Sequence, residues 1–200
     1  MTVADTQTTT PITKPPSTWK TVDGSEVSFA EARLAWADAA YGILRDTAGR
    51  YNEYVTYRAL ADSVQAQSGI QTRLLMRNWV GKVLLSVSER CLKDEGQPLT
   101  ALCVQTADET VSDSYAYLLE LKGEPVPDDI QLSAARARLE CYQAFGATMP
   151  FGGGKVTLTR KVARVRDVAA AKRRMEIPPV LCATCNVQVP ASGKCDECEN

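Results

Sequence analysis

Four cysteines near the end of the sequence have spacing suited to metal chemistry. They lie in "LCATCNVQVPASGKCDECEN", in the pattern C-x2-C-x9-C-x2-C, and they are Cys182, Cys185, Cys195 and Cys198. Each C-x2-C turn can point two thiolates at one ion, and two such turns complete a tetrahedral site. Val187 and Val189 alternate with polar residues, and Gly193 precedes the second pair, which favours a tight hairpin between them. The pattern predicts a minimal zinc ribbon over residues 180–200, with a structural Zn²⁺ as cofactor.

Two disulfides, or a redox-active Cys-x-x-Cys, are the alternatives for these thiols. Disulfides need an oxidising compartment. The opening "MTVADTQTTTPITKPPSTWK" has no apolar stretch of the kind that a secretion signal contains. The sequence also contains no run of about 18 apolar residues, so no membrane span is predicted. We therefore expect a cytoplasmic protein with reduced thiols. A redox motif is more typical as a single pair beside a βαβ unit.

The composition argues against an enzyme. The chain contains no histidine, which excludes Ser-His-Asp and Cys-His nucleophilic catalysis and histidine-based metal sites. A metal held by four thiolates keeps no open position for a substrate. The segment "FGGGK" (151–155) lacks the spacing of a phosphate-binding loop and is interpreted as a flexible joint. No small-molecule substrate is evident.

Charge is unevenly distributed along the chain. The whole sequence carries 23 Lys and Arg against 24 Asp and Glu, but between residues 153 and 176 eight bases face two acids. The bases are Lys155, Arg160, Lys161, Arg164, Arg166, Lys172, Arg173 and Arg174. Such a segment could neutralise several DNA phosphates and make binding strongly salt-dependent. On a helical wheel its charges do not gather on one face, which disfavours a membrane-surface helix. A solvated linker helix is the alternative.

The ribbon itself is acidic, with Lys194 against Asp196, Glu197 and Glu199. A zinc ion with four thiolates adds a formal charge of −2, so this surface repels phosphate. We expect the ribbon to contact protein, or to stabilise the chain, rather than to bind nucleic acid.

The elements that precede the ribbon are predicted to be mainly helical, with a small β-hairpin. Ser28 followed by Glu31 forms a capping box, so a helix is expected to begin there and to end near Gly49. A short strand (54–57), a short helix (58–69) and a long helix (72–96) follow. Residues 99–105 and 114–121 are interpreted as two strands, and residues 128–147 and 157–175 as helices. Trp36, Trp79 and the remaining cysteines, Cys91, Cys103 and Cys141, are expected in the core.

This order of elements is that of a winged helix, a helix-turn-helix variant with a β-wing. The predicted organisation is a disordered arm (1–26), a winged-helix-like domain (27–147), a basic connecting segment (148–179) and the ribbon (180–200). The N-terminal half of the third helix would then enter the DNA major groove. Its candidates for base contacts are Gln71, Thr72, Arg73, Arg77 and Asn78. The alternative is that these are ordinary solvated residues, and the wing, with Asp108, Glu109 and Asp113, is too acidic to enter a phosphate-lined groove.

Part of the sequence resembles a known family. Within "YVTYRALADSV", the residues Thr56, Tyr57, Leu60 and Ala61 resemble the strand–helix start of the winged helix in DNA alkyltransferase-like proteins. The corresponding stretch "PLTALCVQ" has no His and no Cys directly after its Pro, so the resemblance does not imply alkyltransferase chemistry. The whole chain also resembles small uncharacterised proteins of actinobacteria and their phages, in which a helical domain precedes a Cys-x-x-Cys pair, and this implies no particular activity.

The sequence therefore predicts a non-enzymatic DNA-binding or transcription-associated regulatory protein. Affinity would come from the basic segment and sequence preference from the third helix. The alternative is an adaptor that docks on a larger transcription or phage complex through the ribbon and the helical domain.

Overall fold

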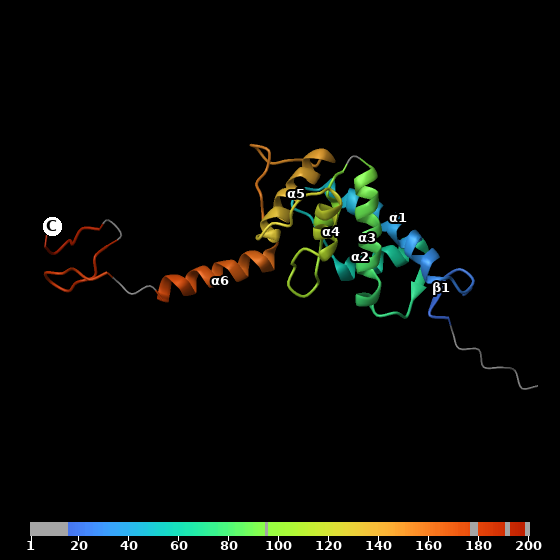
Figure 1. Cartoon of the computed structure of the whole chain (residues 1–200), viewed down its shortest axis with the longest axis horizontal. Helices are drawn as coiled ribbons and strands as arrows, with labels where there is room; N and C mark the ends of the chain where they lie inside the picture. Colours follow the sequence, from blue (N-terminus) through green and yellow to red (C-terminus); the bar gives the residue numbers. More distant parts are fainter. Residues whose placement is uncertain (1–15, 95, 177–179, 191–192, 199–200) are drawn as a thin grey trace, which may run out of the picture. The chain divides into compact units, whose positions relative to one another are not determined.

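The structure is a computed structural model that describes residues 16–94, 96–176, 180–190 and 193–198. The chain divides into two compact units, Met1–Thr159 and Arg160–Asn200. The described part is mainly helical, with two small two-stranded sheets (Figure 1). The first unit contains β1 (Thr18–Lys20), α1 (Phe29–Ala48), β2 (Val55–Thr56), α2 (Tyr57–Ser68), β3 (Ile70–Thr72), α3 (Val80–Lys93), β4 (Cys103–Val104), α4 (Asp113–Leu121) and α5 (Ile130–Ala144). The second unit contains α6 (Arg160–Glu176) and the cysteine-rich end.

Helix α1 begins and ends where its capping residues predict. The Ser28 hydroxyl accepts a hydrogen bond from the Glu31 N–H at 3.2 Å, and the Gly49 N–H donates to the Arg45 carbonyl at 3.1 Å. Both contacts satisfy backbone groups that a helix end otherwise leaves unpaired. The predicted boundaries of this helix are confirmed.

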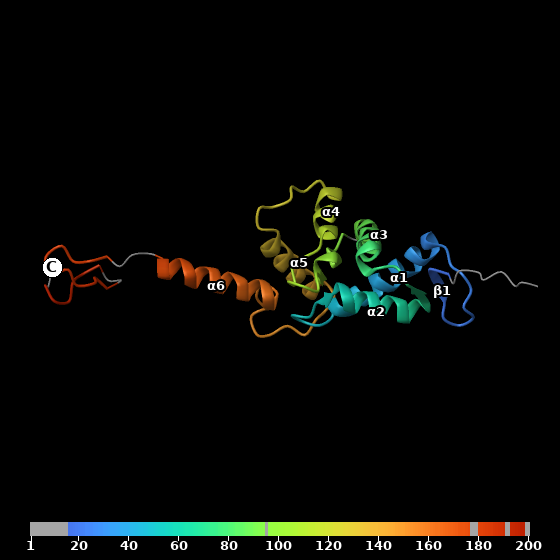
Figure 2. The ribbon, with the colours of Figure 1, turned by 90° about the horizontal axis from the view of Figure 1, so that it is seen from below.

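The core of the first unit is built where α1 packs against α2 and α3. The indole rings of Trp36 and Trp79 lie 4.4 Å apart between their centres, and both side chains are buried. The Trp36 Nε1–H donates to the carbonyl of Ile70 at 3.1 Å, which joins α1 to β3. Helix α4 packs on α3, and the two helices lie side by side in both Figure 1 and Figure 2. The predicted core positions of the two tryptophans are confirmed.

The predicted β-hairpin between residues 99 and 121 is wrong. Residues Asp113–Leu121 form α4, and its buried Tyr115, Leu118 and Leu119 follow helical spacing rather than strand alternation. Residues Leu99–Leu102 form a 3-10 turn, and only Cys103–Val104 continue as a strand. That strand, β4, pairs in parallel with β2, with Val55 opposite Cys103 and Thr56 opposite Val104. Residues 96–121 therefore contain one antiparallel bridge, between Val104 and Val111, but not the predicted two-stranded β-wing.

The start of the predicted long helix at Thr72 is also wrong. Gly69 adopts φ +66° at the end of α2, and the chain then forms β3, a 3-10 turn (Met76–Asn78) and finally α3. Strand β3 pairs antiparallel with β1, and Trp19 lies opposite Gln71. The arm predicted to be disordered thus contributes a strand from residues 18–20, while residues 1–15 lie outside the described residues.

Residues 148–159 belong to the first unit and are hydrogen-bonded to the rest of it. The Lys155 N–H donates to the Tyr51 hydroxyl at 2.8 Å, and the buried Arg138 guanidinium donates to the Thr157 carbonyl at 3.2 Å. A Cβ on Gly154 would lie 2.8 Å from the Tyr51 ring, so this position needs glycine in addition to its φ of +85°. The glycine run is packed at Gly154 and is not a free joint there. Among the described helices, none has the length and apolar composition needed to cross a membrane.

Candidate metal centre and basic helix

The four predicted ligand cysteines come together at the end of the chain. The Sγ atoms of Cys182, Cys185, Cys195 and Cys198 all lie within 4.8 Å of one another. Those of Cys185 and Cys195, one from each pair, are 3.5 Å apart. Four sulfurs placed tetrahedrally about a metal at about 2.3 Å would be separated by about 3.8 Å. All four are free thiols, so the cluster can hold a metal ion.

Backbone hydrogen bonds bring the two cysteine pairs into position. The Cys182 N–H donates to the Val187 carbonyl, the Asn186 N–H donates back to the Cys182 carbonyl, and the Val189 N–H donates to Val180, at 2.8–2.9 Å. Leu181 and Gln188 form an antiparallel bridge. These contacts close a hairpin around the first pair. The hairpin predicted between the two pairs includes residues 191–192, which lie outside the described residues.

Both pairs surround their first sulfur in the same way. The Cys182 sulfur accepts hydrogen bonds from the N–H groups of Thr184 and Cys185, and the Cys195 sulfur accepts from those of Glu197 and Cys198. Two N–H groups aimed at one sulfur stabilise a thiolate, which is the form that binds metal. The two turns thus form matched knuckles.

The thiols also influence one another's ionisation. The backbone N–H groups of Thr184 and Cys185 lower the pKa of Cys182 to about 6. Hydrogen bonding with the Cys185 sulfur raises the pKa of Cys198 to about 12. Four negative sulfurs so close together repel one another, and a bound dication removes that penalty by replacing the protons.

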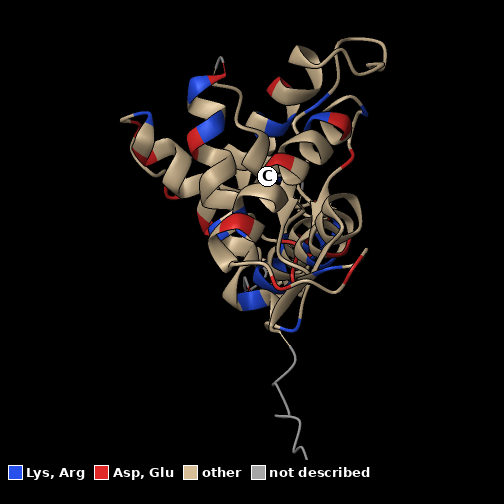
Figure 3. Cartoon of the chain, turned by 90° about the vertical axis from the view of Figure 1, so that its right-hand side faces the viewer, with Lys and Arg blue, Asp and Glu red and all other residues tan. Residues whose placement is uncertain are grey.

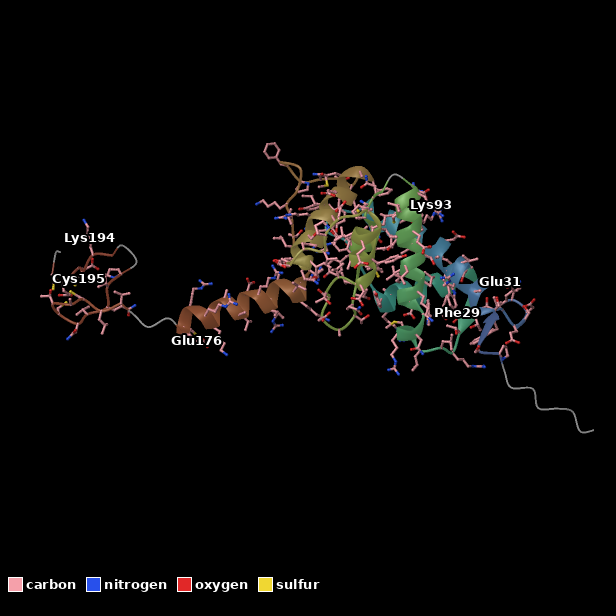
Figure 4. All side chains as sticks on the ribbon, in the orientation of Figure 1. Phe29, Glu31, Lys93, Glu176, Lys194 and Cys195 are labelled. Atoms are coloured by element: carbon pink, nitrogen blue, oxygen red, sulfur yellow. The ribbon has the colours of Figure 1, made fainter. Side chains whose placement is uncertain are left out.

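The basic residues after Thr159 lie on α6, as the sequence predicts for this segment. Val162 is buried near the start of α6, but every residue from Arg164 to Glu176 is exposed, including Val165 (68%), Val168 (62%) and Met175 (87%). Figure 4 shows side chains projecting outward along the helix. This helix contrasts with those of the first unit, each of which has a buried face.

The arginines and the lysines of α6 lie on opposite halves of the helix. Taken together, its basic residues share no face, but at 3.6 residues per turn all five arginines fall within one half of the circumference. This arginine half consists of Arg160, Ala163, Arg164, Arg166, Asp167, Ala170, Ala171, Arg173 and Arg174. The other half, here called the valine half, consists of Lys161, Val162, Val165, Val168, Ala169, Lys172, Met175 and Glu176. The sequence expectation treated all charges alike and so missed this division.

The candidates for base contacts do not start a helix. Gln71 and Thr72 belong to β3, and the Thr72 hydroxyl donates to the Ser17 carbonyl at 2.9 Å. The Arg73 guanidinium lies 4.7 Å from the centre of the Trp19 ring and donates to the Pro16 carbonyl at 3.1 Å. Thr72 and Arg73 thus help to hold the β1–β3 sheet together.

The remaining candidates are spread over separate parts of the chain. Arg77 and Asn78 are exposed, but they lie in the 3-10 turn before α3. Lys155 lies in the first unit, in the segment bonded to Tyr51. Acidic and basic residues are interspersed over the helices of that unit (Figure 3). These residues belong to the first unit, whereas the α6 arginines belong to the second.

The other three cysteines are structural, as predicted. Cys91, Cys103 and Cys141 are all buried. Burial raises the pKa of Cys91 to about 11 and raises the pKa values of Cys103 and Cys141 further. Thiols held in this neutral form are poor nucleophiles and poor metal ligands.

A surface cavity of about 630 Å³ lies at the end of α1. Among the described residues it is lined by Gly42, Arg45, Asp46, Gly49, Arg50 and Phe145, which include no thiol or hydroxyl group. The Arg45 guanidinium lies beside the Phe145 ring at 5.6 Å. Arginine and aspartate side chains together give this cavity no single charge preference.

Comparison of the chain with family models, curated proteins and solved structures gives no match.

Proposed function

We propose that the chain is a non-enzymatic protein that binds double-stranded DNA through the arginine half of α6. The supporting observation is the placement of five arginines and one aspartate on one half of an exposed helix, a local charge of +4. Guanidinium groups bind phosphate through paired hydrogen bonds, so such a surface favours a polyanion with regularly spaced phosphates.

The order of residues around the arginine half suits a DNA major groove, which has phosphates on both sides and base edges between them. Ala163 and Ala170 share its middle with Arg174 and Asp167. Arg166 and Arg173 lie on one flank, and Arg160 and Arg164 lie on the other. A helix in the B-DNA major groove, which is about 12 Å wide, has phosphates on both sides and base edges in front. The small alanines allow close approach, and the flanking arginines reach either strand. At about 1.5 Å per residue, α6 is about 25 Å long.

The valine half makes a membrane surface a poorer partner. Lys161 and Lys172 lie among its valines, so burying this half in lipid would remove two ammonium groups from water. Double-stranded RNA is also less suitable, because its deep, narrow major groove does not admit a helix. Duplex DNA is the partner that suits both halves.

For the cysteine cluster we propose zinc as the metal, in a structural role. Four thiolates without histidine suit Zn²⁺, and the two knuckles would supply all four ligands of a tetrahedral site. The bound ion would hold the two turns together, which a segment this short cannot do with a hydrophobic core.

A salt titration of the full chain tests the DNA proposal. Fluorescence anisotropy of a 25-base-pair DNA duplex, measured at several salt concentrations, should show binding that weakens steeply as salt rises. A duplex RNA of the same sequence serves as control, and we expect at least about tenfold weaker binding to it. An absence of DNA binding at about 50 mM salt would overturn the proposal, and equal binding of both duplexes would overturn the groove geometry.

A second candidate function is protein docking through the ribbon. Val180, Leu181 and Val187 are exposed on this short module, which also exposes the acidic Asp196 and Glu197. Apolar side chains rimmed by charge are typical of protein contact surfaces. A partner that binds the wild type and an Arg166→Gln, Arg173→Gln variant, but not a Cys182→Ser, Cys185→Ser variant, would support docking through the ribbon. Equal binding to all three proteins would refute it.

A further inference from the structure

The valine half of α6 contains a seam with the spacing of a coiled coil. Lys161, Val165, Val168, Lys172 and Met175 are separated alternately by four and three residues. This is the repeat of the a and d positions at which two helices interlock their side chains. From Val165 onward the seam is exposed, so a stripe of valine and methionine faces solvent.

The charges on α6 point to a second copy of the same chain as the occupant of this seam. All five arginines lie on the opposite half, so two helices joined through their valine halves keep the arginines away from each other. The positions flanking the seam are Val162, Arg164, Ala169, Ala171 and Glu176, so only one base lies among them. An acidic partner would bind the arginine half instead, because the charge is concentrated there.

The two lysines limit how strongly such a seam can associate. Lys172 occupies a seam position and lies 3.8 Å from Glu176 on the next turn, which offsets part of its charge. A polar residue at a seam position lowers stability while fixing how the helices align. About two heptads with two lysines give weak pairing in free protein, whereas several copies bound along two DNA segments can pair at the same time.

We propose that two copies of the chain associate through the valine halves of α6, which leaves both arginine halves facing outward to bind DNA. This inference rests on the proposed DNA binding for its setting, but the pairing itself concerns the protein alone. Because the two arginine halves then face opposite directions, such a pair binds two DNA segments and bridges them.

Two matched leucine substitutions test the seam without DNA. Lys172→Leu places an apolar side chain in the seam, whereas Arg173→Leu places the same side chain one position away, on the arginine half. In sedimentation equilibrium of the full chain, we expect Lys172→Leu to dimerise at least about tenfold more tightly than wild type, and Arg173→Leu to resemble wild type. Equal behaviour of the two variants would overturn the proposal.

A second variant tests the bridging of DNA. Val165→Gln, Val168→Gln makes the seam polar without adding charge. When a fluorescent 60-base-pair duplex is captured on an immobilised one, we expect this variant to retain at least about tenfold less duplex than wild type, while its affinity for a single short duplex stays within about threefold of wild type. Unchanged capture would contradict the seam. If no variant binds DNA, the proposed function fails, while the sedimentation comparison still decides on the pairing.

Discussion

In the first unit, Trp36, Trp79 and Leu84 are almost fully buried, whereas no side chain of α6 is buried after Val162. The first unit gains its stability by removing apolar surface from water. The second unit leaves Val165, Val168 and Met175 exposed, and its four clustered thiols and the five arginines on one half of α6 each suit a bound ion or polyion. The first unit is thus organised by its own core, and the contrast fits our proposal that the second unit binds a metal ion and DNA.

Metal removal is expected to have the largest effect, and to affect only one unit. A Cys182→Ser, Cys185→Ser variant should lose the metal and the order of residues 180–198, because zinc binding by such modules contributes about 10 kcal/mol or more. Amide NMR signals of the ribbon should collapse toward random-coil positions, while the melting temperature of the helical unit changes by less than about 2 °C. A fall of the melting temperature by more than about 5 °C would show that the two units are not independent.

A pair of Val→Ala substitutions compares the helices directly. Val83 in α3 is 1% exposed, and Val168 in α6 is 62% exposed. We expect Val83→Ala to lower the free energy of unfolding by about 2 kcal/mol, through lost burial and a residual cavity. Val168→Ala should change it by less than about 0.5 kcal/mol, since alanine favours helices and little burial is lost. Urea denaturation measures both, and equal losses would contradict the contrast in burial.

Capping residues made several helix boundaries predictable from sequence. Ser28 and Asp129 each accept a hydrogen bond from the N–H group three residues later, and Gly69 ends α2 at a φ of +66°, so the local sequence is sufficient to indicate these ends. The segment Ser114–Leu121 was assigned wrongly, because tyrosine and leucine suit either element when the run is short. Packing of this segment against α3 favours the helix over the strand. Strand β3 was missed because its partner, β1, lies about fifty residues earlier in the chain.

The cysteine cluster could be predicted from the sequence, whereas the position of the base-contact candidates could not. The cysteine spacing alone brought four thiols together, because each pair is a local turn. The base-contact candidates depended on where the third helix starts, and that prediction was wrong: Thr72 and Arg73 hold a sheet instead. The arginine half can be derived from the sequence once the bounds of α6 are known and its arginines are plotted separately from its lysines.

The most direct test of the account removes two charges from either half of α6. Arg166→Gln, Arg173→Gln takes two bases from one flank of the arginine half, and Lys161→Gln, Lys172→Gln takes two from the valine half. If the arginine half binds phosphates, the arginine variant should bind a 25-base-pair duplex about 30-fold more weakly at 150 mM salt, with a salt slope smaller by about 1.8. The lysine variant should stay within about threefold of wild type. Equal weakening of both variants would contradict the account, because DNA would then respond only to the total charge of the helix.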